Sequence, residues 1–220
     1  MMKKLLILCL GGTVLLSACV KKKNEATGTT HVRFVNAISN SYTQDVYVDG
    51  ALVYGGKLSE GAVSPYIDYT AGVSNIGIAN TGTTYANISY SYGTTIGEYS
   101  TVFFFQDFNH VLVSGGIRDY MDAPPAGKAR VRFVNLDNYS QTSFTMSVVG
   151  GANLFQSLVF ATASPYYDVD PGAKFTATAT GVVNPVTIDI APVAGKIYTI
   201  WISATSTTDL QAHAFIQNYF

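Results

Sequence analysis

The pentapeptide Val-Arg-Phe-Val-Asn at residues 32–36 occurs again, unchanged, at residues 131–135. A second motif, Ser-Pro-Tyr at residues 64–66, returns at residues 164–166. The two copies of each motif lie 99 or 100 residues apart and keep the same order along the chain. A repeat of this length has the size of a small domain and not of a solenoid unit, so the sequence predicts two homologous domains.

The repeat sets the expected domain boundaries. Residues 31–118 form unit one, and residues 129–220 form unit two. Between them, residues 119–128 contain a Pro-Pro pair, a glycine and two acidic residues, a composition typical of a short, stiff linker.

Both units have the pattern of β-strands. Polar and apolar residues alternate with a period of two, Thr, Val, Tyr and Phe dominate, and no helical periodicity is present. Asp49-Gly50 separates two alternating runs and tolerates the positive φ angles of a tight hairpin turn, and Gly150-Gly151 takes the same place in unit two. We therefore expect an all-β fold of two tandem antiparallel β-sandwiches of the immunoglobulin-like kind. Besides these hairpins, strands are expected near residues 32–37, 62–69, 73–79, 85–91, 99–106, 109–117, 130–136, 158–168, 173–180, 186–191, 197–205 and 210–218.

Strand alternation also predicts which side chains are buried. Phe34 and Phe133 are expected in equivalent core positions, and Arg33 and Arg132 on the opposite strand face. The run at residues 103–105 is Phe-Phe-Phe, which places apolar groups on both faces of one strand. One face of that strand is therefore expected to meet another surface. Trp201 lies in a run that is typical of a core strand.

The N-terminus is typical of an export signal. In residues 1–18, Lys3 and Lys4 precede an apolar run too short for a permanent membrane span. The tetrapeptide that ends at Cys19, Leu-Ser-Ala-Cys, resembles the bacterial lipobox, in which a diacylglyceryl group is attached to the Cys thiol. This resemblance implies cleavage before Cys19, lipid attachment there, and a tether at residues 19–30. The expected membrane contact is made through this lipid.

The sequence holds little sign of catalytic chemistry. The net charge of −1 argues against a nucleic-acid partner, and His31, His110 and His213 have no neighbouring His or Cys at metal-ligand spacing. Asp168 and Asp170 are interpreted as flanking a turn, with a carboxylate pair on one strand face as the alternative. We expect no catalytic residues, no metal site and no cofactor, and hence a protein that is not an enzyme.

The aromatic residues leave two function classes open. Tyr90 and Tyr92 lie in a polar, Tyr-rich stretch and are candidate ligand contacts, although packing within the sheet is the favoured interpretation. The first class is a structural or protein-interaction module, and the alternative is a carbohydrate-binding accessory protein. A row of exposed coplanar rings would favour a glycan, and a mixed apolar patch would favour a protein partner.

The repeated Val-Arg-Phe-Val-Asn motif, the hairpin Asp-Val-Tyr-Val-Asp-Gly at residues 45–50 and the Ser-Pro-Tyr motif together resemble a family of domains of unknown function, DUF4397. The resemblance covers both units and is closer in unit one. It implies an envelope lipoprotein, many relatives of this kind being from Bacteroidota, and it brings no established catalytic residues. The expected location is the cell envelope, anchored to the outer membrane by lipid and facing either the periplasm or the cell surface.

Overall fold

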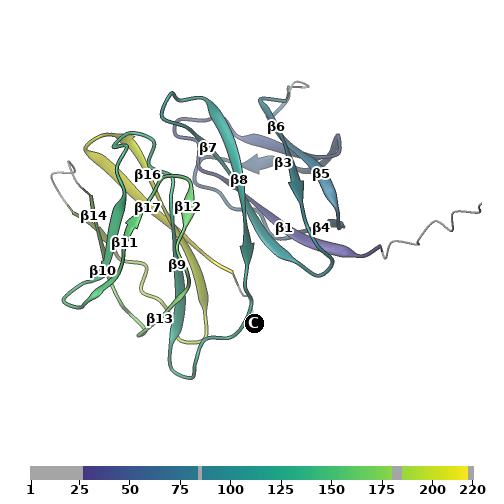
Figure 1. Ribbon diagram of the computed structural model, residues 1–220. Helices are drawn as coiled ribbons and strands as arrows, with labels where there is room; N and C mark the ends of the chain where they lie inside the picture. Colours follow the sequence, from purple (N-terminus) through teal and green to yellow (C-terminus); the bar gives the residue numbers. More distant parts are fainter. Residues whose placement is uncertain (1–26, 84–85, 180–184, 218–220) are drawn as a thin grey trace, which may run out of the picture.

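The computed structural model describes residues 27–83, 86–179 and 185–217, and within these residues every regular element is a β-strand (Figure 1). The expected all-β class is confirmed. Among these described residues, no helix of the length and apolarity needed for a membrane crossing is present.

Unit one is a sandwich of two four-stranded sheets. One sheet has the strand order β4-β1-β7-β8, and the other has the order β3-β2-β5-β6. The eight strands are β1 (Thr29–Asn36), β2 (Gln44–Val48), β3 (Ala51–Leu58), β4 (Ile67–Thr70), β5 (Val73–Asn80), β6 (Ile88–Gly93), β7 (Tyr99–Gln106) and β8 (Leu112–Asp119). The last strand thus extends to Asp119, the first residue of the expected linker.

Unit two repeats this arrangement. The sheet β12-β9-β16-β17, in which β13 also pairs with β9, corresponds to β4-β1-β7-β8, and β11-β10-β14-β15 corresponds to β3-β2-β5-β6. Its strands are β9 (Ala129–Asn135), β10 (Phe144–Val148), β11 (Asn153–Leu158), β12 (Thr162–Ala163), β13 (Tyr167–Val169), β14 (Phe175–Ala179), β15 (Val186–Ile188), β16 (Ile197–Ser206) and β17 (Asp209–Ile216). The shared strand order is the structural counterpart of the sequence repeat.

One pairing in each unit differs from a purely antiparallel sheet. β1 runs parallel to β7, and β9 runs parallel to β16, while every other strand pair is antiparallel. Both parallel pairs join strands that are far apart in the sequence, so no short hairpin connects them. The hairpin turns follow the sequence prediction: Asp49 and Gly50 have φ angles of 49° and 80°, and Gly150 has a φ of 72°.

Each unit has its own hydrophobic core between its two sheets. Phe34 and Phe133 are fully buried in the cores of unit one and unit two, as strand alternation predicts. Phe34 packs with Phe104, whose ring centroid lies 6.3 Å away, and Phe133 packs with Phe175 at 5.2 Å. Phe104 lies on β7, in the same sheet as Phe34, whereas Phe175 lies on β14, in the sheet that faces Phe133. The equivalence of the two units thus lies in Phe34 and Phe133 themselves, which are buried at the same position of β1 and β9.

A third apolar cluster lies between the two units. It consists of residues from the outer faces of β1 and β7, on one side, and of β9, β16 and β17, on the other. Its buried members are Val35, Phe103, Phe105, Val134, Leu136, Trp201 and Phe215. Phe104 belongs to the core of unit one, so the predicted division of the Phe-Phe-Phe run between two surfaces is confirmed. Trp201 is buried as expected, but it packs in this cluster and not in the core of unit two.

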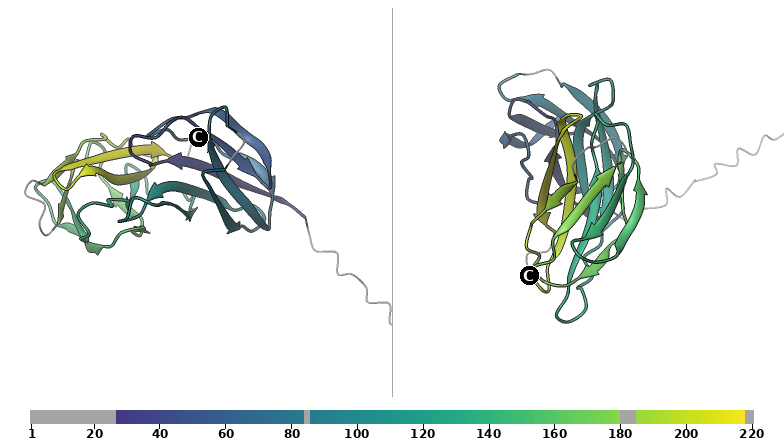
Figure 2. Two further views of the ribbon diagram at one scale, coloured as in Figure 1. Left: turned by 90° about the horizontal axis from the view of Figure 1, so that it is seen from above. Right: turned by 90° about the vertical axis from the view of Figure 1, so that its left-hand side faces the viewer.

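The two sandwiches lie side by side, with the outer faces of β1 and β7 against those of β9, β16 and β17, in an elongated molecule (Figure 2). The described chain begins at the extremity of unit one that is remote from unit two, where β1 starts at Thr29.

Candidate functional site

The strongest site prediction lies outside the described residues. Cys19, the expected lipid attachment site, belongs to residues 1–26, which the structure does not describe, as does most of the expected tether. Lipid attachment thus stays a prediction that rests on the sequence alone.

Tyr90 and Tyr92 lie side by side on β6 with their ring centroids 5.9 Å apart and the rings inclined by 29°. Both side chains are half-buried, and Tyr92 packs against the core of unit one. The Tyr92 ring also covers Gly116 on β8, where an added Cβ would lie 2.1 Å from a ring carbon. Burial raises the pKa of the Tyr92 hydroxyl. This position supports the packing interpretation, and ligand contact at the two tyrosines stays a prediction.

The repeated Ser-Pro-Tyr motif has a structural role that is the same in both units. The Ser64 hydroxyl accepts a hydrogen bond from the backbone N–H of Phe34 at 2.9 Å, and it donates to the Pro65 carbonyl at 2.7 Å. Ser164 makes the same pair of bonds with Phe133 at 3.0 Å and with the following proline at 2.7 Å. The serine thus satisfies a buried backbone donor of the neighbouring strand.

The arginines of the Val-Arg-Phe-Val-Asn motif reach across to the other unit. Arg33, on β1 of unit one, donates from Nη1 to the Ile216 carbonyl at 3.0 Å and from Nη2 to the Gln217 carbonyl at 3.2 Å. Its guanidinium stacks on the Tyr66 ring, with 3.8 Å between Cζ and the ring centroid. These carbonyls belong to the last residue of β17 in unit two and to the residue that follows it. As predicted, Arg33 lies on the face opposite Phe34, but this face is also buried.

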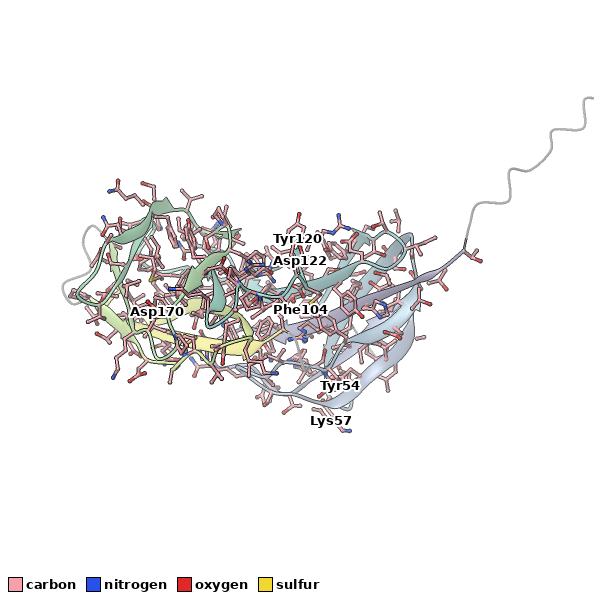
Figure 3. All side chains as sticks on the ribbon, turned by 90° about the horizontal axis from the view of Figure 1, so that it is seen from below. Tyr54, Lys57, Phe104, Tyr120, Asp122 and Asp170 are labelled. Atoms are coloured by element: carbon pink, nitrogen blue, oxygen red, sulfur yellow. The ribbon has the colours of Figure 1, made fainter. Side chains whose placement is uncertain are left out.

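Arg132 makes the reciprocal contact from unit two. Its Nη1 donates to the Arg118 carbonyl at 2.6 Å, its Nη2 donates to the Asp119 carboxylate, and its Nε donates to the Thr199 hydroxyl at 2.9 Å. The Arg132 side chain is 3% exposed and that of Asp119 is 0% exposed, so this is a buried ion pair across the interface. The chain continues from Asp119 to Tyr120 and Asp122 at the surface where the two units meet (Figure 3).

Tyrosines complete both arginine sites. The Tyr66 hydroxyl donates to Asp119 Oδ2 at 2.7 Å, and the Tyr166 hydroxyl donates to Gln217 Oε1 at 3.0 Å. Burial is the largest cause that raises the pKa of both hydroxyls, and Asp119 adds to the shift at Tyr66. The tyrosines therefore remain neutral donors at physiological pH. Each arginine site is thus hydrogen-bonded on several sides, as a buried charge requires.

The remaining polar candidates are paired or dispersed. Asp168 receives two hydrogen bonds from Arg130, at 2.7 and 3.2 Å, and Asp170 receives one from Lys128 at 2.6 Å. The two carboxylates are therefore paired with different basic side chains. Within the described residues, no group of three or more His, Cys, Asp or Glu side chains has the arrangement of a metal site.

Among the described residues, two histidines lie at the unit interface: His110 of unit one, whose Nδ1 is 3.2 Å from Asn138 Nδ2 of unit two, and His213 of unit two. The environment of His213 is the more buried. The Nε2 atom of His213 lies 3.1 Å from the Ser203 hydroxyl, and the His213 ring stacks on Trp201 with 4.7 Å between centroids. Burial lowers the pKa of His213, while Glu60 of unit one acts in the opposite direction. Ser203 is itself buried.

Exposed apolar side chains from both units meet at one end of the interface. Phe108, in the β7–β8 loop, packs against Phe160 of the β11–β12 loop with 4.4 Å between ring centroids. Phe108 is 37% exposed and the neighbouring Val159 is 53% exposed. We call this surface the junction patch; it surrounds a hollow of about 390 Å³, lined by Phe108, Gln141, Thr142, Ser143, Val159 and Phe160. Sequence reasoning missed it because its two loops come from different units.

A glycan-binding surface is expected to present a row of exposed, coplanar aromatic rings. The exposed aromatic side chains among the described residues are Tyr42, Phe108 and Tyr120, on three separate segments, so these residues form no row of exposed coplanar rings. The junction patch, by contrast, is a surface in which apolar side chains are mixed with Gln141, Thr142 and Ser143.

Solved structures show only distant likeness to this chain. The Bacillus anthracis TIE protein aligns with 81% of this chain and 34% of its own length, so this chain spans about a third of that protein, at 9% identity and a TM-score of 0.25. The CBMbc module (family CBM26) of Eubacterium rectale Amy13K, crystallised in complex with maltoheptaose, aligns with 84% of this chain and 96% of its own length, at 10% identity and a TM-score of 0.23. TM-scores this low support no argument about fold or function. No curated protein matches the chain.

The sequence also matches the model of one protein family, which assigns the chain more closely than these structures do. The match begins at residue 30, covers all of unit one and ends at residue 143, in the early part of unit two. A second copy of the family domain in unit two stays a prediction, supported by the repeated strand order. Because the matched residues 30–143 make up more than half of the sequence, the chain belongs to the family of domains of unknown function DUF4397.

Proposed function

We propose that this protein is a non-catalytic, lipid-anchored protein-interaction module of the cell envelope, whose binding surface is the junction patch. The observation that carries the proposal is the contact of Phe108 with Phe160, which builds one exposed apolar surface from two units. Exposed apolar surface of this kind, bordered by polar residues such as Gln141 and Ser143, is typical of protein-binding sites.

The buried unit interface is what would hold this surface in one shape. Domains joined by a linker move relative to each other unless their interface is extensive and apolar. Here an apolar cluster that includes Phe103 and Trp201 is buried between the units, and Arg33 and Arg132 add reciprocal hydrogen bonds. A preformed surface binds a partner without the entropic cost of ordering two loops.

The membrane anchor is proposed from the sequence. The lipobox-like residues up to Cys19 support lipid attachment, and the described chain starts at the far end of unit one. The nine residues between Cys19 and Thr29 span at most about 30 Å when fully extended. The anchor would thus keep unit one next to the membrane, and the junction patch would face away from the attachment point.

Site-specific photocrosslinking in cells tests the binding surface. A photoreactive amino acid at Val159 lies in the junction patch, and the same residue at Val73, which is 79% exposed in unit one, is the matched control. We expect a discrete protein adduct from position 159 that is absent from position 73 and that disappears in a Phe108→Ser background. Equal adducts at both positions, or persistence of the adduct in Phe108→Ser, would contradict the proposal.

A further inference from the structure

The outer face of the sheet β3-β2-β5-β6 in unit one has a gap in its row of side chains. Tyr47 on β2 lies directly opposite Gly77 on β5, which in turn lies opposite Ser89 on β6. Side chains at directly opposite positions point to the same face of a sheet. This row therefore contains the aromatic ring of Tyr47, no side chain at Gly77 and the hydroxyl group of Ser89.

No side chain fills the space above Gly77. A Cβ added at Gly77 would lie 3.1 Å from the Ile88 carbonyl oxygen, which is a tight contact with the neighbouring backbone, and 3.9 Å from the nearest side-chain atom, the Cβ of Ala86. A trough of about 240 Å³ occupies this part of the surface, lined by Tyr47, Gly50, Asn75, Gly77, Ala86 and Ser89. We call it the Gly77 trough. The φ angle of Gly77 is not positive, so its backbone conformation does not require glycine, and the missing side chain is what makes the trough.

Polar groups are held in place along the trough. Ser91 donates a hydrogen bond to Asn75 Oδ1 at 2.7 Å, which orients the amide and leaves its NH₂ group as a donor. The Asp49 carboxylate accepts a hydrogen bond from the backbone N–H of Asn75 at 2.8 Å, which also fixes the position of the Asn75 backbone. The Ser89 hydroxyl lines the opposite wall and can both donate and accept.

We infer that the Gly77 trough is a binding subsite for one neutral pyranose ring of a glycan. The six lining residues include no acidic or basic side chain, which favours an uncharged ligand. Tyr47 brings an aromatic ring to the lining, and aromatic rings can stack on the apolar C–H face of a sugar, while the Asn75 amide and the Ser89 hydroxyl can hydrogen-bond to its hydroxyl groups. The volume lies below the roughly 300–1,000 Å³ of pockets for drug-sized ligands, which suits a single ring.

Unit two provides an internal comparison. The corresponding row across β10, β14 and β15 is Ser147, Thr176 and Thr187. It has neither an aromatic ring nor a glycine gap, so the subsite is specific to unit one. The site is also remote from the contacts of the junction patch, and its failure would leave the proposed protein-binding role untouched.

The test uses the full chain purified in detergent and an array of neutral glucose, galactose, mannose and N-acetylglucosamine oligosaccharides beside charged polyuronates. We expect binding to a neutral oligosaccharide, and calorimetric titration of that oligosaccharide then gives the affinity. Tyr47→Ala and Gly77→Thr should each weaken it by about tenfold or more, whereas Tyr47→Phe, which keeps the ring, should retain it.

Two variants in unit two serve as controls, with an unchanged melting temperature as the check on folding. Ser147→Ala and Thr176→Ser alter the corresponding row and should leave the affinity unchanged. The inference is overturned if the array shows no neutral oligosaccharide bound, if only polyuronates bind, or if folded Tyr47→Ala and Gly77→Thr bind as tightly as the wild type.

Discussion

Arg132 of unit two donates hydrogen bonds to the main chain and the carboxylate at the end of β8 in unit one, where Asp119 is its buried counter-ion. Asp119 is also held by Tyr66 at 2.7 Å and by the Thr101 hydroxyl at 2.6 Å, both from its own unit. The ion pair therefore joins the units, and the tyrosine and threonine fix the geometry of its acidic partner. Arg33 makes the mirror contact to the end of β17.

Removing the charge of Asp119 should destabilise the whole protein. Asp119→Asn leaves Arg132 buried without its counter-ion, and breaking a buried pair in this way costs about 3–5 kcal/mol. The free energy of unfolding from urea titration measures this loss. Asp122→Asn, an exposed acid three residues along the chain, is the control and should change stability by less than about 0.5 kcal/mol. Equal stability of the two variants would argue against a buried pair.

The equivalent core phenylalanines should respond alike to truncation. Phe34→Ala and Phe133→Ala should each lower the free energy of unfolding by about 3–5 kcal/mol, because both side chains are fully buried. Tyr42→Ala removes an aromatic ring that is 77% exposed and serves as the control. Losses of less than about 1 kcal/mol at either phenylalanine would be incompatible with core positions.

Acid should weaken the unit interface through His213. Burial lowers its pKa in the folded protein, so the unfolded chain binds the proton first as the pH falls. Stability is therefore complete above the unfolded value of about 6.5 and decreases as the pH falls below it. His213→Gln should flatten the pH dependence of the melting temperature between about pH 7 and 5. An unchanged slope in the variant would show that His213 is not the group responsible.

Loss of the lipid should release the protein from the membrane. The wild type is expected to partition into detergent, and Cys19→Ala is expected to remain in the soluble fraction, because acyl burial provides the anchor. Persistence of Cys19→Ala in the membrane fraction would refute lipid anchoring. Protease treatment of intact cells distinguishes the two orientations: digestion indicates surface display, and protection until the outer membrane is opened indicates a periplasmic location.

The sequence predicted the strands better than it predicted their partners. Alternation correctly placed Phe34 and Arg33 on opposite faces, because that relationship depends only on the local backbone. It did not show that Arg33 is buried, since the covering surface belongs to the other unit. The parallel pairing of β1 with β7 was missed for the same reason, as the two strands are joined through a long stretch of chain.

For the candidate sites, too, the sequence predicted what depends on one strand and missed what depends on several strands or on both units. Tyr90 and Tyr92 were recognised from composition, but whether their face of β6 points inward depends on the sandwich and not on the strand. The Gly77 trough requires the register of three strands, which no local pattern encodes. The junction patch requires the docking of two units.

The central claim, that the buried interface fixes the two units in one arrangement, is tested most directly by a distance distribution between spin labels. Lys57→Cys in unit one and Asp170→Cys in unit two place the labels at exposed positions that Figure 3 marks, in a Cys19→Ala background. Pulsed electron–electron double resonance should give a single narrow distribution of distances between the labels. This distribution should broaden when Trp201→Ala removes the centre of the interface cluster. A broad distribution in the parent protein, unchanged by Trp201→Ala, would contradict the account.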